Sequence, residues 1–227
     1  MSYLLRVVLP DRPGMLGAVA TALGEVGADI VSLDVVERGP DGAVDDLIVE
    51  LPAGGLADCL ITGAQSVPGV VVESLRPYVG AADLHGDLEL VEALAAADSA
   101  LSVLVMHAPG VFRAGWALLL EGVQVVDRSS GAPAVLSLAG LPSLTAARRA
   151  DLTESWVPDP WRLLGTELAI APVGADRTVL LGRPGGPLFR RSEVLRLGHL
   201  AGITASVAAD QPADLVSGSG SMQPWTT

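Results

Sequence analysis

The 227-residue chain contains no lysine, no asparagine and only one cysteine, and aromatic residues make up 4% of it. The single cysteine, Cys59, excludes an internal disulfide, and its place inside a predicted helix next to Leu60 favours a small buried side chain over a nucleophile. The sequence also lacks a run of 18 apolar residues that would mark a membrane span, and it lacks the N-terminal pattern of a secretion signal. We therefore expect a soluble, cytoplasmic protein.

The charge balance is strongly acidic. The chain has 26 acidic residues against 14 basic ones, all of them arginine, and a net charge of −12 at pH 7. Such a chain repels the phosphates of nucleic acids and the surface of anionic membranes, so neither is an expected partner. The use of arginine alone, with abundant alanine, glycine and valine, indicates a GC-rich genome rather than a mechanism.

The first 30 residues predict a strand, a tight turn and a helix. Residues 3–9 form an apolar strand, and the helix follows from apolar residues at three- and four-residue spacing, Met15, Val19, Leu23 and Val26. In the turn, Asp11 is expected to cap the helix, and Gly27 is expected to end it in the left-handed conformation. The free amides of Gly14 and the next two residues would then attract an anion, as the helix dipole also does.

The next 50 residues repeat strand and helix signals. Residues 30–37 and 44–51 read as two strands joined by a turn, and a helix follows that Pro68-Gly69 stops. Residues 70–79 read as a fourth strand. The order βαββαβ is that of a ferredoxin-like sandwich, in which two helices cover one face of an antiparallel sheet.

The turn motif and the helix end together resemble an ACT domain, the regulatory amino-acid-binding module. The resemblance rests on Asp11-Arg12-Pro13-Gly14-Met15-Leu16 and on Val26-Gly27-Ala28-Asp29-Ile30, and it covers residues 1–79 without a gap. It implies a sensor that pairs with a second copy and binds a small ligand, often an amino acid. The residues implied for the ligand are Asp11, Arg12, Pro13, Gly14, Met15, Leu16, Asp29, Ile30 and Ser32.

One position departs from the family pattern. Many ligand-binding ACT domains have asparagine where this chain has Asp29. An ionised aspartate accepts hydrogen bonds but donates none, so Asp29 favours an ammonium group as its partner. The turn itself also has a purely structural interpretation, because it makes a tight strand-to-helix connection whether or not it binds anything.

The second half predicts another α+β unit. We place helices at residues 83–97 and 99–112, the latter broken at Pro109-Gly110, and strands at 116–121, 123–127, 166–173 and 178–182. The charges between Arg148 and Glu154 suggest a short helix, and residues 158–160 a loop. A last helix is expected to start at Ser192 as its N-cap. The domains would thus span residues 1–80 and 83–208, with a disordered tail at 209–227.

Part of this half resembles a GAF domain, another sensory module. The resemblance rests on the hairpin Leu168 to Gly182 and on Phe189 leading into the last helix, and it covers residues 166–208, with residues 83–165 in outline only. No GAF ligand residue can be placed on this sequence. The second half has no cysteine to carry a bilin.

The sequence shows no catalytic or metal-binding pattern and implies no cofactor. His85, His107 and His199 stand in separate segments, and no nucleophile elbow, Walker loop or dinucleotide fingerprint is present. Asp45-Asp46 is expected to point to opposite faces of a strand, which excludes a shared substrate. Arg190-Arg191 reads as the solvated start of a helix.

Three functions remain open. The leading one is a non-catalytic regulatory protein whose ACT unit binds an amino-acid-like metabolite. The second is an interaction module that binds no small molecule and serves to dimerise and to dock on an unidentified protein partner. The third and least favoured is an enzyme with an ACT regulatory domain, or the regulatory part of an amino-acid metabolic enzyme, because the rest of the chain is short and shows no recognisable catalytic chemistry. A homodimer is expected because apolar residues such as Leu4 and Leu5 occupy both faces of the first sheet, and its helices cover only one.

Overall fold

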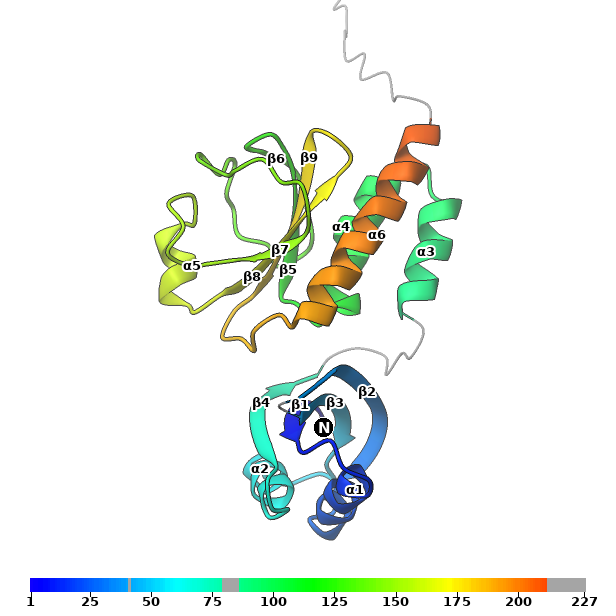
Figure 1. Cartoon of the computed structure of the whole chain (residues 1–227), viewed down its shortest axis with the longest axis vertical. Coiled ribbons are helices and arrows are strands. Elements are labelled where there is room, and N and C mark those ends of the chain that lie inside the picture. Colours follow the sequence, from blue (N-terminus) through cyan, green and yellow to red (C-terminus); the bar gives the residue numbers. More distant parts are fainter. Residues whose placement is uncertain (41, 79–85, 212–227) are drawn as a thin grey trace, which may run out of the picture.

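The computed structural model describes residues 1–40, 42–78 and 86–211, which form two α+β units, each built on an antiparallel sheet (Figure 1). The first unit has the expected order βαββαβ, with a sheet of strand order β2-β3-β1-β4. Its elements are β1 (Ser2–Leu9), α1 (Met15–Glu25), β2 (Asp29–Gly39), β3 (Gly42–Glu50), α2 (Asp58–Gln65) and β4 (Val71–Pro77). The ferredoxin-like prediction is confirmed.

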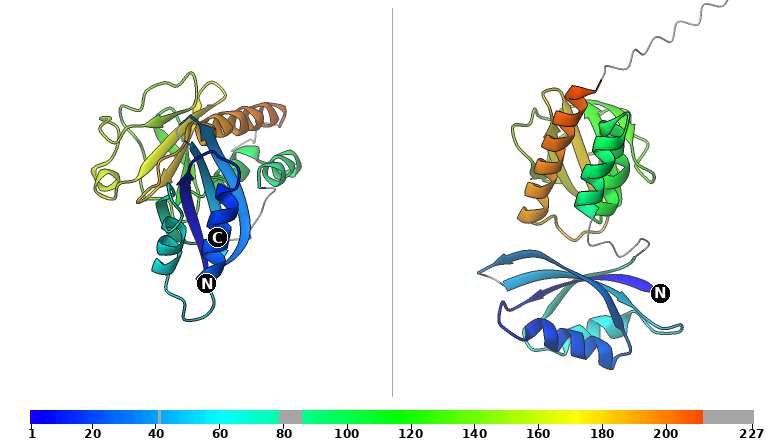
Figure 2. Two further views of the ribbon diagram at one scale, coloured as in Figure 1. Left: turned by 60° about the horizontal axis from the view of Figure 1, so that its bottom comes forward. Right: turned by 90° about the vertical axis from the view of Figure 1, so that its right-hand side faces the viewer.

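Strand alternation decides what each face of the first sheet contacts. Leu5 on β1 and Leu47 on β3 are fully buried against Leu23 of α1 and Leu60 of α2. Full burial of a side chain of this size contributes about 1.5–3 kcal/mol. Helices α1 and α2 therefore close one face of the sheet, as Figure 2 shows in its right-hand view.

The opposite face of the first sheet meets the second unit of the same chain (Figure 2). Leu4 and Ile48 are both 2% exposed although no helix of the first unit covers them. Arg6 and Asp46 form the next cross-strand pair on the same face and are buried as well. The apolar surface that motivated a homodimer is thus covered within the chain, so any pairing of two copies has to use another surface.

The turn before α1 differs from the prediction at its cap. The N-cap is Gly14, in the left-handed conformation with φ +89°, and no side chain caps the helix. The Arg12 amide donates to the Pro10 carbonyl at 2.8 Å, and this tight turn leaves Asp11 three residues before the cap, too early to accept from the helix. At the other end, Gly27 has φ +82°, which confirms the predicted left-handed helix end.

The second unit is a five-stranded antiparallel sheet of order β6-β5-β9-β8-β7. Its strands are β5 (Trp116–Glu121), β6 (Gln124–Arg128), β7 (Arg148–Ala150), β8 (Glu167–Val173) and β9 (Arg177–Arg183). Helices α3 (Gly86–Ala96), α4 (Ala100–Val111) and α6 (Arg191–Asp210) cover one face (Figure 1). The segment that carries β7 and α5 (Asp159–Leu163) covers the other, around Trp116, Trp156 and Trp161.

Two predictions for the middle of the second unit are wrong. Helix α4 continues through Pro109 to Val111, because a proline one turn from the helix end removes a single backbone hydrogen bond there. Residues 148–150 form the edge strand β7, paired with β8, instead of a helix, and α5 begins where a loop was expected. Charged side chains are common on edge strands, so the charges that suggested a helix fit a strand equally well.

The last helix also differs at both ends. It starts at Arg191 with Arg190 as its N-cap, and Glu193 accepts the Arg190 amide at 2.7 Å, while Ser192 donates instead to the Val36 carbonyl. It ends at Asp210 with Gln211 as its C-cap, so Ala209, Asp210 and Gln211, which we assigned to the tail, belong to α6 and its cap. The rest of that tail and the predicted domain boundary lie in 212–227 and 79–85, outside the described residues.

Candidate functional site between the two units

The predicted ligand residues of the N-terminal turn lie together at one end of the first sheet. Asp11, Arg12, Pro13 and Gly14 are exposed, and Met15 is half-buried, as is Leu16. The Met15 amide donates to the Arg12 carbonyl at 3.3 Å, so it is less free than the sequence suggested. The turn offers a water-accessible arginine and carboxylate with nothing packed over them.

The other predicted ligand residues lie at the far end of the sheet. Asp29 pairs with Glu50, which pairs with Ser2 at the start of β1, while the turn follows Leu9 at the end of β1. At about 3.3 Å per residue, the two ends of β1 are about 23 Å apart. Asp29, Ile30 and Ser32 therefore cannot join the turn on one small ligand within a single chain. Ser32 is buried, and its hydroxyl has no hydrogen-bond partner.

No metal centre emerges from the described part of the chain. Within it, no group of three or more His, Cys, Asp and Glu residues could hold a metal ion, and no helix is long and apolar enough to span a membrane. His107 and His199 are exposed on helices α4 and α6. His85 lies outside the described residues.

The most elaborate polar arrangement joins the two units, and it starts from Arg6 and Asp46. These residues are cross-strand neighbours on β1 and β3, 1% and 0% exposed. Arg6 donates to both carboxylate oxygens of Asp46, at 2.7 and 2.8 Å, and to both oxygens of Glu193 on α6, at 3.2 Å each. One guanidinium thus holds a carboxylate from each unit.

Glu193 is held from its own unit as well. Its carboxylate accepts from Arg183 at 2.7 Å, and Arg183 also donates to the Phe112 carbonyl at 2.6 Å. The Arg183 guanidinium lies over the Phe189 ring, 3.9 Å from the centroid, where a cation is favourable. These contacts position the first turn of α6 against the first sheet.

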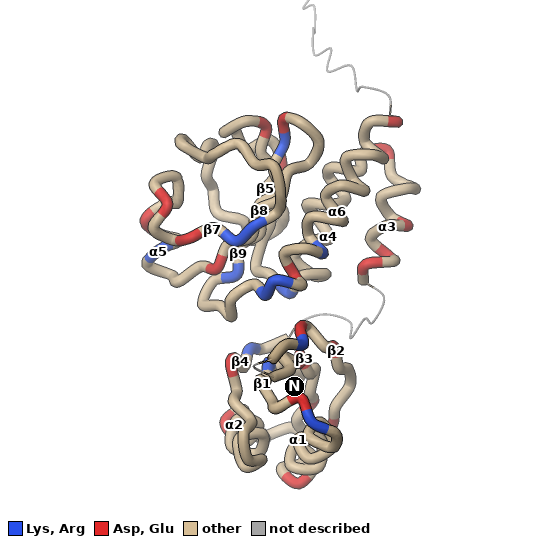
Figure 3. Tube along the Cα trace, in the orientation of Figure 1, with Lys and Arg blue, Asp and Glu red and all other residues tan. Residues whose placement is uncertain are grey.

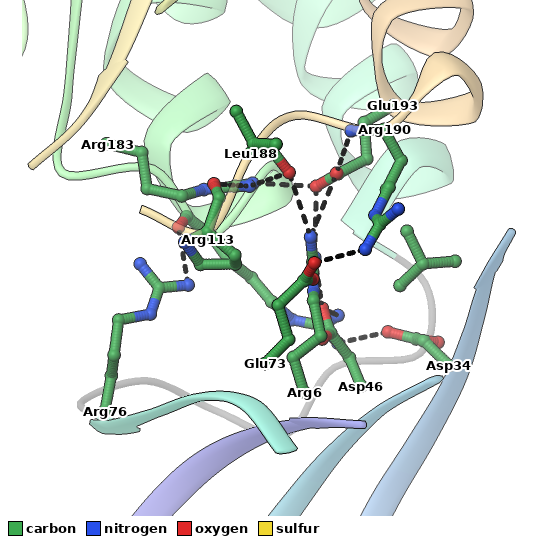
Figure 4. Close-up of polar contacts among 12 residues, drawn as sticks. Arg6, Asp34, Asp46, Glu73, Arg76, Arg113, Arg183, Leu188, Arg190 and Glu193 are labelled. Carbon is green, nitrogen blue, oxygen red and sulfur yellow. Dashed lines mark hydrogen bonds and ion pairs between the residues drawn. The ribbon is translucent and has the colours of Figure 1, made fainter. Parts of the chain in front are cut away.

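Outer contacts extend the network over all four strands of the first sheet (Figure 4). Arg113 donates to Asp46 at 2.7 Å and pairs with Asp34 on β2, and Arg190 pairs with Glu73 on β4. Figure 3 shows basic segments of the second unit facing the first along this junction. The prediction that Arg190 is merely solvated is wrong, because it binds the other unit.

The buried carboxylates of this network stay ionised. Burial alone would raise the pKa of Asp46, but its hydrogen bonds and proximity to Arg6, with Arg113, hold it below the ordinary value. Burial would likewise raise the pKa of Glu193, but Arg183 and Arg6 outweigh burial and hold this pKa below its ordinary value. The pKa of Arg6 is raised, because Asp46 and Glu193 outweigh its burial. The junction is therefore a set of true ion pairs at neutral pH.

Sequence reasoning missed this network. Its signal is a charge placed inside an apolar alternation, Arg6 among the apolar residues of β1 and Asp46 beside Leu47 on β3. Such residues are rarely buried unless they are paired, so each predicts a partner on the facing surface. The sequence does not say which residue that partner is.

Residues 3–76 match the family model of the ACT domain. The first unit is an ACT domain. A search of curated proteins found no match for the chain. The sheet face of this ACT domain that its own helices leave open is the one that contacts the second unit.

Solved structures give weaker similarities. A GAF domain from Pseudomonas syringae pv. tomato is 16% identical, with 56% of this chain and 85% of that one covered and a TM-score of 0.43. A formyltetrahydrofolate deformylase from Pseudomonas putida KT2440 is 14% identical, with 41% and 37% covered and a TM-score of 0.30. The regulatory subunit of aspartate kinase from Thermus flavus is 10% identical, with 92% of each chain covered and a TM-score of 0.28. At these values, none of the three assigns an activity.

Proposed function

We propose that this protein is a non-catalytic regulatory protein whose ACT domain binds a small amino-acid-like metabolite and passes the bound state to the second unit. The observation that carries this proposal is the ACT match over residues 3–76, the part of the chain that contains the turn motif. The buried ion pairs support the second part, because they connect the ACT sheet directly to helix α6.

The chemistry of the exposed turn supports an amino acid as ligand. Arg12 and the free backbone amides at the start of α1 can donate to a carboxylate, and Asp11 can accept from an ammonium. A free amino acid carries both groups. The left-handed Gly14 places no side chain in the approach to these amides.

A homodimer would complete this site. β2 is an edge strand of the first sheet and exposes two apolar side chains, Val31 at 45% and Val35 at 47%. If two copies pair antiparallel along β2, the turn end of one sheet lies beside the β2 start of the other. Asp29 and Ile30 of one copy would then face the turn of its partner.

The proposal is tested by a thermal-shift panel of the twenty amino acids on the full chain. A ligand at a hundred times its Kd stabilises the folded state by about 2.7 kcal/mol. Arg12→Ala should abolish the shift without changing the unliganded melting temperature, because Arg12 is exposed and forms no ion pair. Gly14→Val is a poorer choice, because φ +89° strains any side chain there.

Arg149→Ala is the matched control for Arg12→Ala. Arg149 is an exposed arginine on β7 of the second unit, and its loss should leave the shift intact. If no amino acid stabilises the protein, the alternative stands, in which both units serve only to dimerise and to dock on a partner. If a ligand binds equally well to Arg12→Ala, its site is not the turn.

A further inference from the structure

A cleft of about 1040 Å³ lies between the ACT domain and the second unit, beside the ion-pair network. Strands β2 and β4 contribute Asp34 and Arg76 to it, and the second unit contributes Arg113 and Arg196. It is separate from the turn considered above, because Arg76 pairs with Leu4 near the start of β1 and the turn follows the end of that strand. A molecule in this cleft would touch both units at once.

The charges around the cleft balance in number, six arginines against six acids, but not all of them are paired. Within the described residues, Arg6, Arg113, Arg183 and Arg190 each pair with a carboxylate of the network, and Arg196 pairs separately with Asp87 at 2.8 Å. The network carboxylates are Asp34, Asp46, Glu73 and Glu193, and Glu89 also lines the cleft, without an ion pair among the described residues. Arg76 is the arginine left without a carboxylate.

The surroundings of Arg76 make the lack of an ion pair costly in folding free energy. Its guanidinium donates to the Arg113 carbonyl at 3.4 Å, a long contact, and its buried Nε has no partner (Figure 4). Burial first, and then the nearby charges of Arg183 and Arg6, lower the pKa of Arg76 to about 10, against the opposing effect of Asp46 and Glu193. On the same face of β4, the buried hydroxyl of Ser74 also has no partner. A partly buried cation without a counter-ion costs folding free energy that a bound anion would return.

We propose that the cleft binds a small molecule through a carboxylate, which acts as the missing counter-ion of Arg76 and joins β4 of the ACT domain to the second unit. One guanidinium without an ion pair matches one carboxylate. The planar guanidinium can donate two parallel hydrogen bonds to its two oxygens. This site does not depend on the amino-acid site at the turn.

The test measures binding of simple anions to the full chain by calorimetry, at constant ionic strength set with sodium chloride. The carboxylate probes are acetate and N-acetylglycine, which lack an ammonium group, and inorganic phosphate is the competing anion. The carboxylates should bind, and Arg76→Gln should weaken them about tenfold or more, the loss expected for one charged hydrogen bond. Arg149→Gln should bind them as the unaltered chain does.

A second measurement guards against misfolding of the variant. Because Arg76 has no carboxylate partner, unliganded Arg76→Gln should melt at or above the temperature of the unaltered protein. A drop of several degrees would show that Arg76 holds the fold together, and would overturn the proposal. So would carboxylate binding that survives Arg76→Gln, the absence of carboxylate binding, or binding of phosphate alone.

Discussion

Arg6 shows how a charged side chain can be fixed inside an apolar strand. Removing a guanidinium from water costs several kcal/mol, so a buried arginine persists only where its partners are well placed. Asp46 provides two hydrogen bonds from the neighbouring strand, and Glu193 provides two more from the other unit. The arginine therefore binds the two units together through one carboxylate from each.

The first prediction is that replacing Arg6 and Asp46 together lowers the free energy of unfolding by less than the two single substitutions would suggest. Asp46→Leu should lower the free energy of unfolding by about 3–5 kcal/mol, because it leaves Arg6 and Arg113 short of a buried partner. The double variant Arg6→Met, Asp46→Leu should lower the free energy of unfolding by less. In it, Glu193 still has its ion pair with Arg183, and Arg113 still has its ion pair with Asp34. Urea unfolding measures both, and a double variant as unstable as the sum of the single ones would contradict this account.

The second prediction concerns acid. Asp46 and Glu193 have folded-state pKa values below their unfolded values, so their stabilising contribution is complete above the unfolded pKa, about 4, and is lost as the pH falls through the lower folded values. The free energy of unfolding should therefore fall as the pH drops below about 5. Between pH 7 and pH 3, the urea midpoint should fall less steeply in the double variant Asp46→Asn, Glu193→Gln than in the unaltered protein. An equal slope in that variant would place the acid sensitivity elsewhere.

Among the elements, β9 contains the tightest packing of the second unit. Gly182 lies under the ring of Trp116 on the neighbouring strand, and a Cβ built there would be 2.0 Å from a ring atom. Trp116 cannot retreat freely, because its ring also packs on Trp161, with the two centroids 4.8 Å apart. The glycine is therefore needed for space, and not for a special backbone conformation.

The third prediction follows from this packing. Gly182→Ala should lower the free energy of unfolding by about 1–3 kcal/mol or more, the usual cost of overpacking a core. Gly202→Ala on α6 is the matched control, because nothing lies within 4 Å of its Cβ position. In a helix interior this change should stabilise by about 0.5–1 kcal/mol. Thermal unfolding of both variants checks the opposite signs, and equal effects would refute the role of Trp116.

The elements also show which parts of this structure can be predicted from the sequence. The order of the ACT domain was predictable, because its signals are local: apolar periodicity, Pro13, and glycines at helix ends. The network was not, because it joins Arg6 to residues 40 and 187 positions along the chain, and no spacing encodes such a contact. The helix predicted around residues 148–150 is wrong for a related reason, since pairing with β8 outweighs the helical preference of their own sequence.

At the scale of the whole molecule, the two units share one surface, and this limits how copies can associate. The open face of the ACT sheet is occupied by the second unit, so the proposed dimer has to form along an edge such as β2. An edge contact leaves both buried faces unchanged.

The fourth prediction is that the full chain is a dimer at micromolar concentration and that Val31→Arg makes it monomeric without changing its fold. Val31 is 45% exposed on edge strand β2, and a charge there opposes strand pairing. Val126→Arg is the matched control, because Val126 is 52% exposed on β6, the edge of the other sheet. Light scattering decides the outcome. A monomeric unaltered chain, or a dimer that survives Val31→Arg, would refute an interface along β2.

Helix α6 has a mechanical consequence. Its 20 residues span about 30 Å as a single rod, and both of its ends are fastened. Glu193 ties its first turn to the ACT sheet, and the Gln211 side chain just beyond its last residue bonds the Ala97 carbonyl at 2.8 Å and the Ala100 amide at 3.0 Å, where α3 and α4 meet. A tilt of about 5° at the first turn would carry the far end through about 2.6 Å over that length. A small movement of the ACT sheet that tilts α6 would therefore produce a larger displacement where α3 and α4 meet, on the opposite side of the second unit.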